Sequence, residues 1–217
     1  MKTILRTNIS ILITYSILLI AALMFIFINS KADTHLFFNA HHNSFFDSFF
    51  YFTTFLGDGI AAILVIIILL AVKYRFAIIV ALSTVVSALI AQALKHLVFA
   101  DVVRPKKFFE GMHDLYFVPG VDNWLYNSFP SGHSTCAFSM YIALALIVKQ
   151  KRWKWLLFIL AIVTGYSRVY ISQHFLEDIT AGSVIGTVTA VVMYYWVNAK
   201  DKKWLNQSII DSLRKSQ

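Results

Sequence analysis

Two histidines in this sequence stand in polar surroundings that suit catalysis: His133 ends the stretch "PSGH", and His174 lies in "SRVYISQHFLED". Asp178 follows His174 by four residues, so the two side chains share one face of a helix. A carboxylate on one imidazole nitrogen fixes the tautomer and makes the other nitrogen a better nucleophile. We therefore expect His174 to attack an electrophile, and a protonated His133 to give its proton to the leaving group.

Three cations accompany these histidines and indicate that the electrophile is phosphorus. Guanidinium groups match phosphate oxygens two at a time, and an ammonium group adds a compact charge. The turn before His133 adds Ser131 and Gly132, and free backbone N–H groups where a helix opens favour an anion. The pattern predicts phosphoryl transfer through a phosphohistidine at His174, with fixed cations in the place of a metal ion. The three cations are Lys95, Arg104 and Arg168.

Three other functions compete with this interpretation. A serine hydrolase would use Ser131 or Ser167, but Ser131 is only two residues from His133 and Ser167 adjoins an arginine. A lipid or anion transporter would explain the cations but not the pairing of a histidine with an aspartate. A metal site would draw on an N-terminal group that forms no clear ligand set: Asp33, His35, His41 and His42.

The composition predicts that membrane-spanning helices position these residues. Of the 217 residues, 59% are hydrophobic and 14% are charged, against about 45–50% and about 25% in soluble domains. We expect an all-α fold in a single integral membrane domain over residues 1–217. The one cysteine, Cys136, excludes an internal disulfide and is expected to be a small buried side chain.

Six apolar segments are candidates for spans, since a bilayer core needs about 20 apolar residues per helix. The first could instead be a signal peptide, but its apolar run is too long for a usual signal core. The second is short and is expected to begin earlier, within "FTTFLGDG". The six are Ile9–Ile28, Asp58–Val72, Phe76–Phe99, His133–Val148, Trp155–Ile171 and Ile179–Val197.

The distribution of charge predicts the orientation. Most of the 19 lysines and arginines fall on the side that holds both termini, which is therefore cytoplasmic. The net charge of +8 is thus explained by topology and anionic lipid, and predicts no nucleic-acid partner. In the cytoplasmic tail, residues 199–217, we expect a short interfacial helix whose lipid-facing residues are Trp204, Leu205, Ile209 and Leu213.

A phenylalanine-rich segment, "THLFFNAHHNSFFDSFFYFTTFLGDG", follows the first span. Its mixture of aromatic and polar residues favours a helix that lies in the outer interface or re-enters the membrane. Packing in the aromatic belt is the simpler explanation, and a wall beside a lateral entrance for lipid is the alternative.

The motifs resemble those of the type 2 phosphatidic acid phosphatase (PAP2) superfamily. "PSGH" is similar to its second motif, and Ser167, Arg168, His174 and Asp178 fit its third, which is Ser-Arg, five residues, His, three residues, Asp. The first motif is Lys, six residues, Arg-Pro, whereas eight residues separate Lys95 from Arg104 here. The resemblance covers about residues 36–198.

The resemblance implies a PAP2/haloperoxidase-like core of six helices and metal-independent hydrolysis of a phosphomonoester or diphosphate, without a cofactor. It implies a bacterial inner-membrane enzyme whose active site faces the periplasm or exterior. Its substrates would be phosphatidylglycerol phosphate, phosphatidic acid, undecaprenyl diphosphate or lipid A. We expect no obligatory protein partner.

Overall fold

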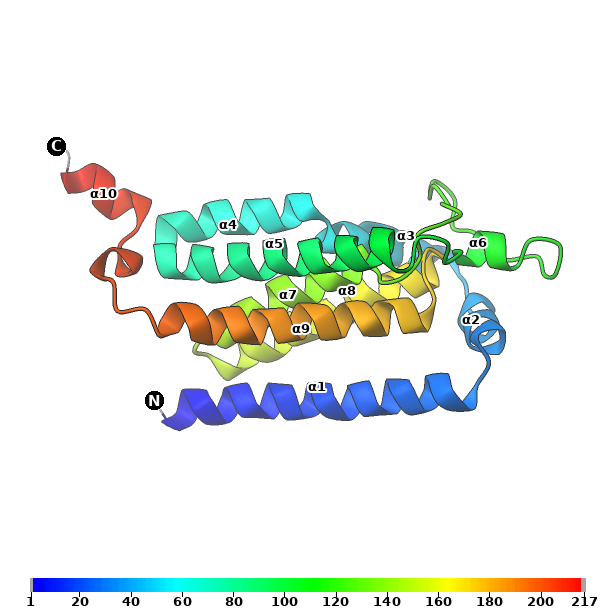
Figure 1. Ribbon diagram of the computed structural model, residues 1–217, viewed down its shortest axis with the longest axis horizontal. Coiled ribbons are helices and arrows are strands. Elements are labelled where there is room, and N and C mark those ends of the chain that lie inside the picture. The colour runs from blue at the N-terminus through cyan, green and yellow to red at the C-terminus, as the bar shows by residue number, and fades with distance from the viewer. Residues whose placement is uncertain (1, 216–217) are drawn as a thin grey trace.

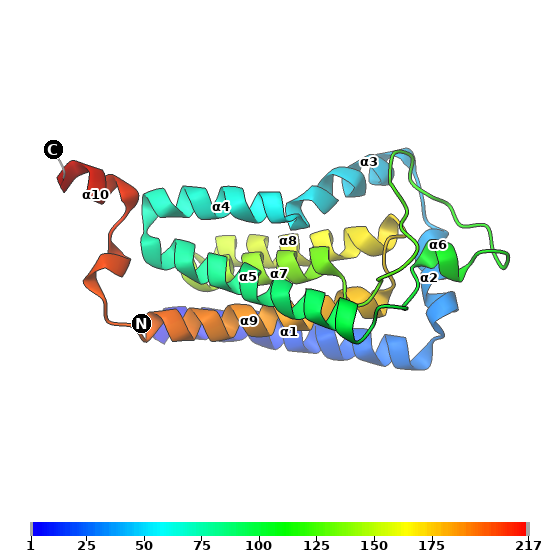
Figure 2. The same ribbon diagram turned by 45° about the horizontal axis from the view of Figure 1, so that its top comes forward.

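Six long helices run side by side in an all-α bundle, as Figures 1 and 2 show. The computed structural model describes residues 2–215 and the side chains of residues 8–214. No strand occurs in this described part of the chain, so the all-α prediction is confirmed. Each predicted apolar segment coincides with one of the long helices: α1 (Lys2–Ile28), α4 (Gly59–Val72), α5 (Tyr74–Leu97), α7 (Gly132–Ile147), α8 (Lys151–Tyr170) and α9 (Leu176–Asn198).

The prediction of six membrane spans is not confirmed. Within the described residues, only α1, α5 and α9 are long and apolar enough to cross a membrane alone. Helix α7 has 16 residues and is therefore about 24 Å long, less than the roughly 30 Å of a hydrocarbon core. It lies within the bundle, where neighbouring helices rather than lipid cover most of its surface.

The second predicted span corresponds to α4, which begins at Gly59 and not earlier as expected, and a separate helical unit precedes it at a bend. Residues 44–57 of the phenylalanine-rich segment form α3 (Ser44–Thr53) and the short 3-10 helix η1 (Thr54–Gly57), and this unit meets α4 at an angle of 57°. The pair would make a fourth span if it crosses as one unit. At Gly57, a Cβ atom would lie 2.8 Å from the Thr164 side chain and 2.9 Å from the His133 carbonyl oxygen. The glycine thus lets η1 pack closely against α7 and α8.

The remaining elements lie at the two ends of the bundle. At one end are α2 (Lys31–Asn39), which includes the start of the phenylalanine-rich segment, and α6 (Pro105–Phe108). At the other are the start of α1 and the tail elements η2 (Lys203–Asn206) and α10 (Ile209–Lys215) (Figure 1). The position of the phenylalanine-rich segment at the membrane interface stays a prediction. The tail was expected to form one short helix and instead forms two elements, η2 and α10. The expectation that Leu205 faces lipid was wrong, since its side chain is buried in the protein. Trp204 is exposed.

The predicted domain extends beyond the described residues at both ends. Met1 and the last two residues of the predicted tail, Ser216 and Gln217, lie outside the described residues. The side chains of Lys2, Arg6 and Lys215, which contribute to the predicted cytoplasmic charge, also lie outside the described side chains.

Two glycines on α9 allow it to lie directly against α7. A Cβ at Gly182 would lie 2.7 Å from the Ser131 carbonyl oxygen, and one at Gly186 would lie 2.5 Å from the Thr135 carbonyl oxygen. Both neighbours are backbone atoms, which no change of rotamer can move aside. This contact fixes the start of α7 beside the start of α9, where His133 and Asp178 lie.

Gly186→Ala is therefore expected to destabilise the protein. Alanine favours a helix over glycine by about 1 kcal/mol, but forcing α7 and α9 apart costs about 1–3 kcal/mol, so the steric effect wins. Thermal unfolding in detergent measures the change. Gly59→Ala is the matched control, because no atom lies within 4 Å of its added Cβ. Equal melting temperatures for the two variants would contradict the expectation.

Candidate active site

His174 and Asp178 meet at the start of α9, with Nδ1 of the histidine 3.3 Å from Oδ2 of the aspartate. The i, i+4 spacing brings them together, although not on one helical face as expected, because His174 precedes the first residue of α9. Asp178 is in the first turn, and its carboxylate points back to accept the backbone N–H of Phe175 at 2.9 Å. His174 is 1% exposed and Asp178 is 0% exposed. This arrangement fixes Nδ1 against the carboxylate and leaves Nε2 available for chemistry.

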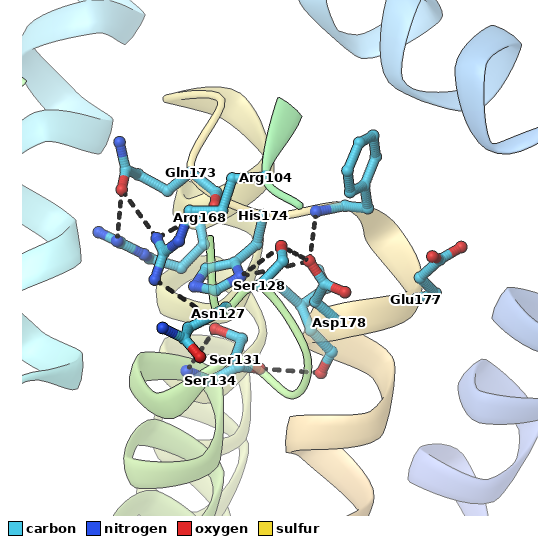
Figure 3. Close-up of polar contacts among 12 residues, drawn as sticks. Arg104, Asn127, Ser128, Ser131, Ser134, Arg168, Gln173, His174, Glu177 and Asp178 are labelled. Carbon is cyan, nitrogen blue, oxygen red and sulfur yellow. Dashed lines mark hydrogen bonds and ion pairs between the residues drawn. The ribbon is translucent and has the colours of Figure 1, made fainter. Parts of the chain in front are cut away.

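Ser128 completes the surroundings of this pair. Its hydroxyl donates to Oδ2 of Asp178 and lies 3.5 Å from Nδ1 of His174. The Asp178 carbonyl accepts the backbone N–H of Ser131 at 3.0 Å. These contacts, drawn in Figure 3, join the chain before α7 to the start of α9.

The "PSGH" turn forms the N-terminus of α7. Ser131 is the N-cap, and its hydroxyl oxygen accepts the N–H of Ser134 at 3.3 Å. A serine N-cap of this kind satisfies one of the free amides of the first helical turn. A Cβ at Gly132 would meet no atom within 4 Å, so there is open space beside the helix end. A ligand could therefore approach the α7 backbone here.

His133, in the first turn of α7, lines a groove with a volume of about 400 Å³. The groove lies between α4, α5 and α7 and is mostly apolar. His133 is within electrostatic range of His174 and of all three predicted cations. Cys136, expected to be buried, is half-buried and also lines this groove.

Arg168 lies in the last turn of α8 and is buried. Its Nη1 donates to the Thr54 hydroxyl at 2.7 Å, and its Nη2 donates to Oε1 of Gln173 at 3.4 Å. Its Nε is buried without a hydrogen-bond partner among the described residues. A buried donor without a partner is costly, and a phosphate oxygen would satisfy it.

Arg104 and Lys95 reach the site from the α5 side. Arg104 Nε donates to the Tyr126 carbonyl at 2.9 Å, and its Nη1 donates to Oε1 of Gln173 at 3.0 Å. Lys95, in the last turn of α5, is buried and within electrostatic range of Arg104, Arg168 and Asp178. The longer spacing between Lys95 and Arg104 therefore does not remove the lysine from the group.

The surroundings of His174 keep its ring neutral. Burial lowers the pKa of His174 well below its ordinary value, and the positive charges of Arg104, Arg168 and Lys95 lower it further. The imidazole is therefore unprotonated at neutral pH, which is the form that can act as a nucleophile.

The structure brings together all eight predicted site residues at the end of the bundle that carries α2 and α6. Figure 3 shows Arg104, Ser131, Arg168, His174 and Asp178 pointing toward a common region. Sequence reasoning missed three residues that contact this group: Thr54, Ser128 and Gln173. The position of Gln173 directly before His174 could have indicated that it lies in the site. Nothing in the sequence pattern distinguishes Thr54 or Ser128 from other hydroxyl residues.

The N-terminal histidines do not form a metal site. Among the described side chains, no group of three or more His, Cys, Asp or Glu is arranged to hold a metal ion. His35 is buried with its ring stacked on Phe109, and His42 Nδ1 contacts Asp47 at 3.1 Å. These contacts are structural.

Comparisons with known proteins give a family match and several relatives. The PAP2 superfamily model matches residues 76–202, which include every predicted site residue. The chain is 32% identical to a bacitracin transport permease protein, BcrC, of Bacillus licheniformis over 35% of this chain and 36% of that protein. It is 27% identical to the undecaprenyl-diphosphatase BcrC of Bacillus subtilis over 71% of this chain and 77% of that protein.

A solved structure shares the fold. The PAP2-type phosphatidylglycerolphosphate phosphatase of Bacillus subtilis superposes with a TM-score of 0.65 at 22% identity. The superposition covers 91% of this chain and 98% of that one.

Proposed function

This chain belongs to the PAP2 superfamily, and on that basis we propose that it is a membrane phosphatase acting on a phosphorylated lipid. The observation that carries the proposal is the buried His174–Asp178 pair beside two arginines and a lysine. A neutral imidazole backed by a carboxylate is a nucleophile. The cations around it suit a phosphoryl group.

The reaction would proceed in two steps. Nε2 of His174 attacks phosphorus, the bond from phosphorus to the leaving oxygen breaks, and His133 gives a proton to that oxygen. The negative charge of the bound phosphoryl group would offset the surrounding cations and so favour the protonated form of His133 that this step needs. Water then attacks the phosphohistidine, the P–N bond breaks, and His133 accepts the proton from the water. Lys95, Arg104 and Arg168 stabilise the charge on the phosphoryl oxygens in both steps. Ser131 and Gly132 would add contacts from the α7 N-terminus.

The groove beside His133 supports a lipid substrate. It opens between α4, α5 and α7, and its walls include Ala62, Ile63, Ile66, Val85 and Ala88. A hydrocarbon chain in this groove would place its headgroup near His133 while the rest of the tail stays in the bilayer. Lateral entry of this kind requires the site to lie near one membrane surface. We propose that this surface is the outer one, with both termini in the cytoplasm of a bacterial inner membrane.

The serine hydrolase finds little support. The Ser167 hydroxyl donates to the Thr164 carbonyl at 2.6 Å, and Ser131 caps α7. Neither is hydrogen-bonded to a histidine among the described contacts. The transporter alternative leaves the buried His174–Asp178 pair without a role, although one relative is called a transport permease.

Phosphate release from defined lipids in detergent tests the proposal. We expect purified protein to release phosphate from at least one of undecaprenyl diphosphate, phosphatidylglycerol phosphate, phosphatidic acid and lipid A. We expect inhibition by orthovanadate, which mimics phosphate in its transition state, and full activity in EDTA. A serine-directed phosphonate should leave the activity unchanged. No release from any of the four lipids would overturn the proposal, and loss of activity in EDTA would overturn its metal independence.

A further inference from the structure

Gln173 bridges the two arginines of the site. Its Oε1 accepts from Nη1 of Arg104 at 3.0 Å and from Nη2 of Arg168 at 3.4 Å. Its backbone joins the same residues, because its carbonyl accepts from Arg104 Nη1 at 3.3 Å and its N–H donates to the Arg168 carbonyl at 2.9 Å. Gln173 is 2% exposed and directly precedes His174. Figure 3 shows its side chain beside both guanidinium groups.

The other end of the side chain fixes its orientation. Nε2 of Gln173 donates to the Asp122 carbonyl at 3.0 Å and to Oδ1 of Asn123 at 2.7 Å. Both partners are acceptors, so the amide nitrogen must face them and the amide oxygen must face the arginines. A carboxamide satisfies all four contacts. A carboxylate would oppose two acceptors, and an apolar side chain would make none of these bonds.

The neutrality of this bridge matters for anion binding. Two guanidinium groups that share one acceptor are held at a fixed separation despite their mutual repulsion. Because the amide carries no net charge, both arginines keep their full positive charge. Arg168 also keeps its buried Nε free of protein partners within the described region.

We propose that Gln173 is a positioning residue: it aligns Arg104 and Arg168 for one phosphoryl group and ties that alignment to Asp122 and Asn123 in the loop between α6 and α7. The inference rests on the proposed function, since it assigns the arginines to phosphate. A loop movement that lengthens the bond to Asn123 would release the amide and separate the guanidinium groups. Anion affinity would then depend on a loop that need not touch the phosphate.

Gln173→Met tests the bridge, because methionine keeps the length and volume but makes none of the side-chain bonds. We expect the dissociation constant of inorganic phosphate, measured by calorimetry on the intact protein in detergent, to rise about tenfold. The KM for the active lipid should rise by a similar factor and kcat should fall less. Gln173→Glu should weaken phosphate binding at least as much. It should also move the acidic limb of the pH–rate profile upward, because a carboxylate beside His174 favours the imidazolium.

Controls separate this role from packing. Gln150→Met changes an exposed glutamine at the other end of the bundle and should change nothing. Asn123→Ala should weaken phosphate binding less than Gln173→Met, and the double variant should be no weaker than Gln173→Met alone, because both act through one bond. Wild-type phosphate affinity in Gln173→Met would overturn the inference alone. A wild-type protein that binds no phosphate and hydrolyses no lipid would overturn both the inference and the proposed function.

Discussion

Replacing His174 with alanine is expected to abolish phosphate release, with a loss on the order of 10⁴–10⁶-fold, as deletion of a nucleophile usually produces. The neutral ring is the group that would form the covalent bond, and Asp178 holds it in place beside the cations. In the variant, a water molecule would have to attack phosphorus in place of the imidazole, and no Nε2 would remain to accept a proton from it. Steady-state phosphate release from the best lipid in detergent measures the loss.

A covalent intermediate gives a second readout for the same residue. With substrate labelled in its phosphate, rapid denaturation of the wild type should trap label that is stable in alkali and released by acid, as a phosphoramidate is. His174→Ala should trap none, and it should still bind inorganic phosphate, because the arginines remain. His113→Ala, which changes an exposed histidine of the loop between α6 and α7, is the matched control and should behave as the wild type. Substantial turnover by His174→Ala would instead favour the transporter or serine hydrolase reading.

The residues that sequence alone could identify are those whose chemistry is unusual for their surroundings. Charged and titratable side chains beside long apolar runs are few, and their depth follows from the positions of the runs. That is why Arg168, His174 and Asp178 were expected at one end of the bundle. Their roles stay predictions, whereas the all-α fold and the family are confirmed.

The residues that sequence could not identify are those whose role depends on tertiary contacts. Thr54 becomes a partner of Arg168 only because Gly57 lets η1 pack against α7 and α8. Ser128 meets Asp178 only because the α7 N-terminus lies beside that of α9. No sequence pattern predicts either contact, because most serine and threonine hydroxyls form hydrogen bonds with nearby backbone groups.

The same argument applies to the membrane spans. Hydropathy located six helices, but it could not show that α7 is enclosed by its neighbours. A helix enclosed by protein need not match the thickness of the bilayer, so its 16 residues are sufficient. Nor could hydropathy show the 57° bend before α4.

Arg168→Lys is expected to lower kcat/KM by about 10²–10³-fold, although the charge is kept. The two Nη atoms of the guanidinium group donate to Thr54 and Gln173, and Nε has no partner among the described residues and would donate to a phosphate oxygen. One rigid planar group thus holds three donors in fixed positions. An ammonium group is a single point on a flexible chain and cannot hold these positions together. The loss should appear in kcat as well as in KM, because charge on the phosphoryl oxygens must be stabilised in the transition state.

Arg152→Lys is the control, since Arg152 is exposed at the opposite end of the bundle and should tolerate the change. The inhibition constant of orthovanadate separates a specific effect from misfolding. Partial unfolding would lower the amount of active enzyme but would leave this constant unchanged. The inhibition constant should rise in Arg168→Lys in proportion to the fall in kcat/KM, because vanadate resembles the transition state. If Arg168→Lys kept more than half of the wild-type kcat/KM, a simple positive charge would suffice at this position. The Nε donor, oriented by the bonds of the two Nη atoms to Thr54 and Gln173, would then not be what binds the phosphoryl group.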